Sequence, residues 1–341
     1  METLISGRCD LHSVPDSYVL SANTRPGKDE VPFFESIPVI DLGINSIHDR
    51  PGVVSQILEA AREFGLFQLT NHGISAEQME DTLRVAKEFF HLPMEEKGKY
   101  FSEDPKQSCR LYTSIEYRKE KVHFWRDALR HPCYPLEDHW HSWPEKPDWY
   151  REVIGRFSTE VRKLSLLLLG LIGEGLGLEH GFFNEGLTRV QLLALNHYPP
   201  CPDPSLTLGL PPHGDVNLIT VLLQGKVPGL QFLREGSWLA VRPCPGALLV
   251  NIGHALEVIS NGNVRTVEHR VVTDGQHERT TVGSFIHPAY DSQIEPARKL
   301  VNDRGGRPLY KSVTYKDFVS TYIVDTYEIK PFPERYALKR D

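Results

Sequence analysis

Two histidines and one aspartate are the residues whose types and spacing could bind a metal ion. His213 and Asp215 are two positions apart, and residues i and i+2 of a β-strand project from the same face. His269 lies on a later predicted strand and could supply a third ligand. Two histidines and one carboxylate occupy one face of an octahedral ferrous ion and leave three positions for substrate oxygens and dioxygen. A His-x-Asp pair often arises by chance, so this assignment depends on the residues around it.

A pair of residues that could bind a carboxylate follows the last of these histidines. Arg279 offers a planar guanidinium for bidentate binding, and Thr281, two residues on, presents a hydroxyl to the same strand face. Asn196 and Tyr198 share a strand face in the same way, and they could donate to the same molecule. The intervening His197 points to the opposite face, and we expect it to be structural. An isolated arginine at the start of a strand is more often a surface residue, so the pair gains weight only beside the metal triad.

The elements that must position these side chains begin with an N-terminal half of mixed character. Ser75 and Gln78 resemble a capping box, and the helix they open should stop near Leu92 because Pro93 follows. Apolar periodicity predicts further helices at 53–64 and 148–178. Strands are predicted at 37–42, 65–70, 111–117 and 123–129.

After residue 189 the chain changes to short apolar runs separated by Gly, Pro or Asn. These runs lie at 190–196, 218–223, 229–233, 237–241, 247–252, 264–272 and 279–286. Short strands at this spacing are typical of a β-sandwich or jelly roll. We expect a mixed α+β fold with a loosely ordered lead-in at 1–36 and a single domain at 37–341. That domain divides into a helical part (37–189), the metal-binding core (190–290) and a C-terminal segment (291–341).

The composition excludes several kinds of partner. The chain has 341 residues, of which 40% are hydrophobic and 24% charged, with a formal net charge of -7 and no long basic run. We therefore expect no nucleic acid or membrane partner. The longest apolar run, Leu166 to Ile172, is too short to span a bilayer. Five scattered cysteines without a CxxC pair argue against both a disulfide framework and a thiolate zinc site, which indicates a reducing compartment such as the cytoplasm.

The ordered motifs of the chain resemble the plant 2-oxoglutarate/Fe(II)-dependent dioxygenase family from about residue 37 to residue 331. The likeness is carried by Ile37-Pro38-Val39-Ile40-Asp41-Leu42, Asn71-His72-Gly73, Asn196-His197-Tyr198-Pro199-Pro200-Cys201, His213-Gly214-Asp215, Asn251-Ile252-Gly253, His269-Arg270 and Arg279-Thr280-Thr281. Within the family, segments such as Trp125-Arg126-Asp127 are similar to the branch of the salicylate 5-hydroxylases of the downy-mildew-resistance type, hyoscyamine 6-hydroxylase and the mugineic-acid hydroxylases.

This resemblance implies a double-stranded β-helix, or jelly roll, wrapped by N-terminal and central helices. The family's iron ligands map onto the triad of two histidines and one aspartate, and its 2-oxoglutarate-binding pair maps onto Arg279 and Thr281. Asn196 and Tyr198 are expected to assist. The family pattern usually has serine where this chain has Thr281, which keeps the hydroxyl. Gly214 fills the variable position between two ligands, so we expect it to matter little to the iron.

The implied activity is hydroxylation of a small specialised metabolite or hormone-like molecule, such as a phenolic, flavonoid or alkaloid. Fe(II), 2-oxoglutarate and dioxygen would be required, ascorbate would serve as reductant, and succinate and carbon dioxide would be released. We expect a monomer whose substrate pocket is lined by Phe124, Trp125 and Phe285, although large rings are more often core residues. Three alternatives stay open: a desaturase, a 2-oxoglutarate-independent oxidase of the same fold, and a non-catalytic jelly-roll protein that binds a metal or ligand.

Overall fold

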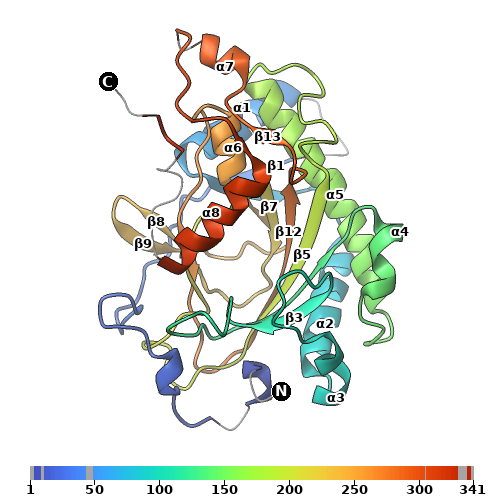
Figure 1. Cartoon of the computed structure of the whole chain (residues 1–341), viewed down its shortest axis with the longest axis vertical. Coiled ribbons are helices and arrows are strands. Elements are labelled where there is room, and N and C mark those ends of the chain that lie inside the picture. Colours follow the sequence, from blue (N-terminus) through green and yellow to red (C-terminus); the bar gives the residue numbers. More distant parts are fainter. Residues whose placement is uncertain (1–3, 9–10, 44–48, 304, 329–335, 339–341) are drawn as a thin grey trace.

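Two β-sheets enclose a cavity, and helices cover the outer face of the larger sheet (Figure 1). The computed structural model describes residues 4–8, 11–43, 49–303, 305–328 and 336–338. The larger sheet has the strand order β1-β2-β10-β7-β12-β5-β4-β3, and the smaller has the order β6-β11-β8-β9. Residues of both sheets line the cavity between them. The predicted mixed α+β jelly roll is confirmed.

The strands are short, as the apolar runs predict, apart from two of nine residues. The larger sheet contains β1 (Val39–Asp41), β2 (Leu66–Thr70), β3 (Arg110–Thr113), β4 (Asp127–Pro132), β5 (Val190–Tyr198), β7 (Ile219–Leu223), β10 (Leu248–Ile252) and β12 (Arg279–His287). The smaller contains β6 (Leu210–His213), β8 (Leu230–Arg234), β9 (Ser237–Ala240) and β11 (His269–Val271). A separate pair is formed by β13 (Gln293–Ile294) and β14 (Val313–Thr314).

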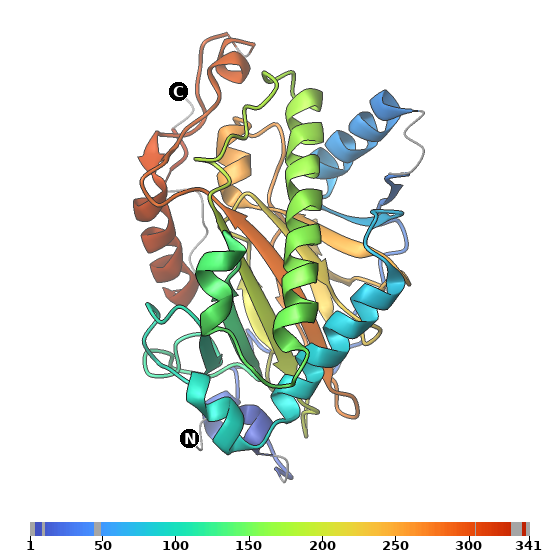
Figure 2. The same ribbon diagram turned by 90° about the vertical axis from the view of Figure 1, so that its right-hand side faces the viewer.

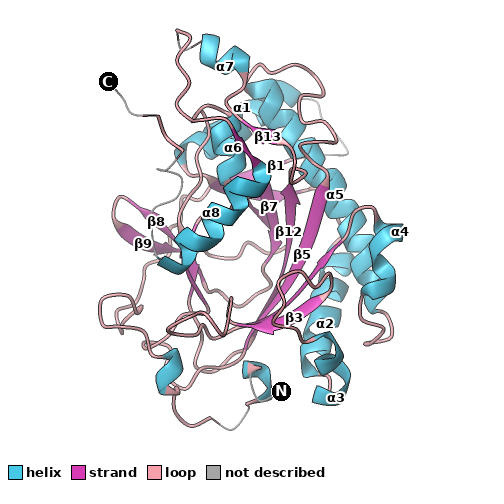
Figure 3. Cartoon of the chain, viewed as in Figure 1, coloured by secondary structure: helices cyan, strands magenta, loops and turns pink. Residues whose placement is uncertain are grey.

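Three helices pack on the outer face of the larger sheet (Figure 2). They are α1 (Arg50–Glu63), α2 (Ala76–His91) and α5 (Tyr150–Gly175). The Ser75 side chain accepts a hydrogen bond from the backbone N–H of Gln78, which satisfies one free amide of the first turn of α2. The apolar face of α5 buries Ile154, Phe157 and Val161 against the sheet. The other helices are α3 (Met94–Lys97), α4 (Leu136–His139), α6 (His254–Ile259), α7 (Arg298–Asn302) and α8 (Tyr315–Glu328), which Figure 3 separates by colour from the strands.

The predicted strand pair at 111–117 and 123–129 is shorter than expected and is shifted along the chain. The paired segments are β3 and β4, and residues 114–126 form an irregular loop between them. Ser114 adopts a left-handed φ of 59°, and the Glu120 carboxylate accepts hydrogen bonds from the backbone N–H groups of Ile115 and Glu116. These bonds draw the backbone amides away from a strand ladder.

None of the described helices combines the length and apolar character that a bilayer span requires.

The described part of residues 4–36 packs on the rest of the molecule instead of forming a loosely ordered lead-in. Tyr18 is fully buried, with its ring centroid 5.4 Å from that of Trp125. The buried Asp127 carboxylate accepts hydrogen bonds from the backbone N–H groups of Ile5 (3.0 Å) and Ser6 (2.8 Å). The prolines of this segment preclude a regular period, but they do not prevent tertiary packing of isolated apolar residues.

Replacing Asp127 by alanine is expected to lower the free energy of unfolding by about 2–4 kcal/mol, because two backbone N–H groups lose their acceptor. Urea denaturation would measure the change. The exposed Asp138, replaced by alanine, is the matched control and should stay close to the wild-type value. A loss below about 0.5 kcal/mol for Asp127→Ala would show that these bonds do not anchor the N-terminal segment.

Candidate metal centre

The smaller sheet and the turn after β6 bring the three candidate ligands together. His213 is the last residue of β6 and pairs with His269, the first residue of β11. Oδ1 of Asp215 lies 3.9 Å from His213 Nε2 and 3.8 Å from His269 Nε2. The three donor atoms all lie within 4.8 Å of one another, and their side chains face the cavity. The pattern of two imidazoles and one carboxylate fits a ferrous ion with open positions.

The expected strand geometry is wrong for Asp215, because β6 ends at His213 and the aspartate lies in the following turn. Its backbone carbonyl accepts a hydrogen bond from His254 N (2.7 Å) at the start of α6. This turn is packed against Gly253, where an added Cβ would lie 1.9 Å from the Asn217 carbonyl oxygen. Helix α6 was not predicted, and its close approach to the turn places the carboxylate.

Gly214 matters more than its place between two ligands suggests. A Cβ at this position would lie 2.5 Å from His254 Nε2 and 2.7 Å from Thr266 Cγ2. Both neighbours belong to packed parts of the structure, so a larger residue would have to displace one of them. Packing therefore restricts this position to glycine, whatever its influence on the iron.

The two histidines are oriented by backbone carbonyls. Nδ1 of His213 lies 2.8 Å from the Pro211 carbonyl oxygen, and Nδ1 of His269 lies 3.1 Å from that of Val267. A proton on each Nδ1 leaves both Nε2 atoms free to bind a metal. Burial, together with the neighbouring His269 ring, lowers the pKa of His213 to about 3, so its imidazole is neutral at pH 7. Neutral imidazoles are the form in which histidine binds a metal.

Asn251 on β10 donates a hydrogen bond from Nδ2 to Oδ2 of the candidate ligand Asp215 (3.4 Å). Replacing Asn251 by alanine is expected to raise the Fe(II) concentration that gives half-maximal 2-oxoglutarate turnover by about 10- to 100-fold, because the ligand loses its orienting group. Exposed Asn302, replaced by alanine, is the control. An unchanged Fe(II) requirement would argue against this role for Asn251.

Strands β5 and β12 bring the candidate carboxylate-binding residues together on one face. Their antiparallel register sets Arg279 opposite Tyr198 and Thr281 opposite Asn196. All four side chains line the cavity that contains the metal triad. Arg279 is only 3% exposed, and its Nε donates to the Val227 carbonyl oxygen (3.2 Å). Its Nη2 is buried without a hydrogen-bond partner among the described residues. A buried, unpartnered guanidinium nitrogen fits the distal carboxylate of 2-oxoglutarate.

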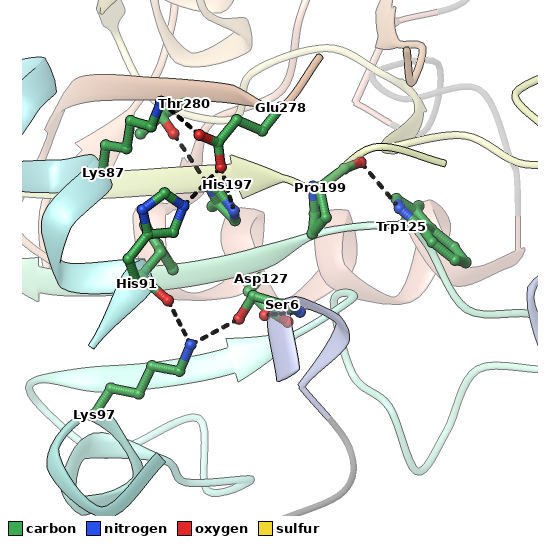
Figure 4. A network of polar contacts seen from close by, with 11 residues as sticks. Ser6, Lys87, His91, Lys97, Trp125, Asp127, His197, Pro199, Glu278 and Thr280 are labelled. Atoms are coloured by element: carbon green, nitrogen blue, oxygen red, sulfur yellow. Dashed lines mark hydrogen bonds and ion pairs between the residues drawn. The ribbon is translucent and has the colours of Figure 1, made fainter. Parts of the chain in front are cut away.

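The outer face of the same strands carries a polar network (Figure 4). His197 Nδ1 lies 2.9 Å from Thr280 Oγ1, and Glu278 Oε2 lies 2.8 Å from His91 Nε2. Lys87 pairs with the other oxygen of Glu278 at 2.5 Å. His91, His197 and Glu278 are close enough to hold a metal ion, but Lys87 already supplies the positive charge, so we interpret the cluster as an ion-pair network. It ties α2 to the strands whose inner faces hold the carboxylate-binding residues.

The cavity has a volume of about 280 Å³, and of the three predicted aromatic residues only Phe285 lines it. The expectation is wrong for Phe124 and Trp125, neither of which is among the described lining residues. Trp125 is 2% exposed in a separate apolar cluster with Ile5 and Tyr18, and its Nε1 donates to the Pro199 carbonyl oxygen (3.1 Å). The lining residues that sequence reasoning missed include Tyr112, Arg126, Arg130, His287 and Tyr322. Arg126 lies in the predicted strand 123–129 and Arg130 directly follows it, so their spacing of four positions, which puts both on one face of a strand, was the available signal for those two.

Comparison with protein families finds two matches in this chain. Residues 189–288 match the 2OG-Fe(II) oxygenase superfamily, and residues 37–150 match the non-haem dioxygenase in morphine synthesis N-terminal family. The first match contains all three candidate ligands and the carboxylate-binding residues. The second covers α1, α2 and the strands β1 to β4.

Curated proteins of plants are similar to the chain over most of their length. Flavanone 3-dioxygenase 2 of Oryza sativa subsp. japonica is 44% identical to this chain, and the match covers 91% of this chain and 90% of the rice protein. Hyoscyamine 6-dioxygenase of Hyoscyamus niger is 43% identical, and the match covers 94% of this chain and 96% of that protein. Protein DOWNY MILDEW RESISTANCE 6 of Arabidopsis thaliana is 41% identical, and the match covers 91% of each chain. Among solved structures, JOX2 in complex with 2OG, Fe and JA superposes with a TM-score of 0.82 at 32% identity, covering 94% of this chain and 93% of that one.

Proposed function

The chain belongs to the 2OG-Fe(II) oxygenase superfamily, and on this premise we propose that it hydroxylates a small specialised metabolite or hormone-like molecule, with succinate and carbon dioxide as co-products. The single observation that carries the proposal is that one cavity contains both the His213, Asp215 and His269 triad and the unpartnered Nη2 of Arg279. A metal site and a carboxylate site in one cavity suit a chelating keto acid.

The residues of the chain divide the work of binding and orientation. His213, Asp215 and His269 would hold Fe(II), which supplies the redox chemistry that activates dioxygen while 2-oxoglutarate is decarboxylated. Arg279 and Thr281 would hold the distal carboxylate of 2-oxoglutarate. These five side chains are all buried or half-buried. Their orientation is therefore fixed before the ligands arrive.

Neighbouring residues shape the rest of the cavity. Asn196 and Tyr198 face the same cavity from β5, and they would orient the co-substrate by hydrogen bonds. Apolar side chains such as Leu192, Val216 and Phe285 exclude water and position a C–H bond of the substrate. An enclosed apolar wall beside a few polar groups is typical of small-molecule sites.

A mass-spectrometric screen tests the proposed reaction. The protein with Fe(II), 2-oxoglutarate and ascorbate would be incubated with phenolic acids, flavonoids and alkaloids, and a gain of one oxygen is expected in at least one class. Loss of two hydrogens would indicate the desaturase instead. If the chain were a non-catalytic binding protein or held zinc, anaerobic addition of Fe(II) and 2-oxoglutarate would fail to produce the weak visible absorption band that the oxygenase should show.

We also propose that the protein is a monomer of the reducing cytoplasm. The four described cysteines are unpaired, and three of them are buried: Cys109, Cys133 and Cys201. Burial raises the pKa of the Cys109 thiol to about 12, so it stays protonated and inert. Light scattering in the presence of a reductant would test the proposal, with a mass near 38.8 kDa expected.

A further inference from the structure

Two arginines of β4 and its approach line the cavity together with Arg279. Arg126, Ala128 and Arg130 follow one another at every second position, so they share one side of the strand. Both arginines line the cavity. Tyr112 of β3 is the cross-strand partner of Ala128 and lines the cavity between them. The metal triad and this basic group thus lie in one space.

Arg126 is held in place without a charged partner. It is 7% exposed, its Nη1 donates to Asn196 Oδ1 (3.2 Å) and its Nη2 donates to the Ser114 carbonyl oxygen (2.6 Å). Its Nε is buried and has no hydrogen-bond partner among the described residues. Arg130 donates from Nη2 to the Pro105 carbonyl oxygen (3.1 Å). Neither guanidinium forms an ion pair with a carboxylate of the described chain.

The cavity has an excess of positive charge once its expected ligands are bound. Asp215 is the only carboxylate among its described lining residues. The charges of Fe(II), 2-oxoglutarate, Asp215 and Arg279 cancel, which leaves the charges of Arg126 and Arg130 uncompensated. Arg126 is buried and Arg130 is half-buried. A charge that is removed from water without a partner is unfavourable, so a negative group is expected beside them.

The pKa of the Tyr112 phenol is lowered by the same positive charges. Burial alone would raise the pKa of Tyr112, but the guanidinium groups of Arg126, Arg130 and Arg110 lower it below its ordinary value. The guanidinium of Arg110 stacks 4.4 Å from the centre of the Tyr112 ring. Arg126 and Arg130 therefore present positive charge to the cavity, and Arg110 adds to the potential at Tyr112 from outside the cavity lining.

We propose that Arg126 and Arg130 bind a carboxylate of the substrate, so that the enzyme takes a small organic acid whose apolar part lies against Phe285. This inference rests on the proposed oxygenase function and narrows its substrate class. Arginine matches the planar geometry of a carboxylate through two parallel hydrogen bonds. The same two charges disfavour the ammonium group of an alkaloid, and a phenolic acid fits better than a neutral flavonoid.

Equilibrium binding of matched pairs tests the subsite. Benzoic, cinnamic and phenylacetic acids and their methyl esters would be titrated anaerobically into the protein loaded with Fe(II) and 2-oxoglutarate. Each acid is expected to bind at least about tenfold more tightly than its ester, which corresponds to one charge-assisted hydrogen bond. Acids that bind no better than their esters, or do not bind at all, would overturn the proposal.

Variants of the two arginines locate the preference. Arg130→Gln should remove most of the preference for acids over esters, whereas Arg130→Lys should retain part of that preference because the charge remains. Arg118→Gln is the control, since that side chain is 80% exposed and pairs with Glu103 outside the cavity. A preference that persists in both Arg126→Gln and Arg130→Gln would overturn the assignment.

A second readout separates failure of this inference from failure of the proposed function. Enzymes of this chemistry should form some succinate from 2-oxoglutarate and Fe(II) without substrate. If the wild-type protein forms succinate but does not distinguish acids from esters, the carboxylate subsite is wrong and the oxygenase function stands. If it forms no succinate under any condition, the oxygenase function is contradicted.

Discussion

Replacing Asp215 by alanine is expected to reduce Fe(II)-dependent succinate formation by more than about a hundredfold. Loss of a group that only orients a ligand already costs about 10- to 100-fold in metal affinity or activity, and this change removes the ligand itself. The carboxylate also lies 3.8–3.9 Å from both histidine Nε2 atoms, so no other described carboxylate of the cavity can replace it. Succinate formation at saturating 2-oxoglutarate would measure the loss.

Two controls make the Asp215 result interpretable. The variant should still unfold cooperatively, because removing the carboxylate also removes a charge that is buried in the metal-free protein. Asp291, which is exposed, should retain full activity when it is replaced by alanine. Full turnover in Asp215→Ala would show that the iron ligands have been assigned incorrectly.

Replacing Arg279 by alanine is expected to raise the 2-oxoglutarate concentration required for half-maximal turnover by roughly 10- to 150-fold. This range corresponds to about 1.5–3 kcal/mol for hydrogen bonds to a charged group. Arg279→Lys should fall between the wild type and alanine, because lysine keeps the charge but not the planar pair of donors. Initial rates over a range of 2-oxoglutarate concentrations would measure the effect.

The Arg279 variants need a control of the same chemical type. Arg118→Ala removes an exposed guanidinium that does not line the cavity and should leave the 2-oxoglutarate requirement unchanged. If neither Arg279 variant requires more 2-oxoglutarate than the control does, Arg279 is not the anchor for the co-substrate.

Long strands made the carboxylate-binding face predictable from sequence. Arg279 and Thr281, like Asn196 and Tyr198, lie in strands of nine residues whose side chains alternate regularly between the two faces. The sequence therefore indicates which residues share a face, and the pairing of β5 with β12 brings both pairs together. His197 lies on the outer face for the same reason.

Other parts of the site could not be predicted from the sequence, because they depend on short elements and on packing between distant segments. Asp215 lies in a turn whose path depends on α6, a helix of six residues with too little sequence to show a period. Trp125 is turned away from the cavity because the N-terminal segment supplies Ile5 and Tyr18 as a separate apolar cluster. Packing between segments more than a hundred positions apart leaves no local pattern.

The central claim is that oxidation of the substrate is coupled to decarboxylation of 2-oxoglutarate at this iron site. The most direct test supplies 2-oxoglutarate labelled at its C1 carboxylate, together with Fe(II) and a substrate found in the screen, and counts labelled carbon dioxide against oxidised product. We expect one carbon dioxide for each product molecule, with both absent when Fe(II) is omitted. Product formed without release of label would contradict the account and identify a 2-oxoglutarate-independent oxidase of the same fold.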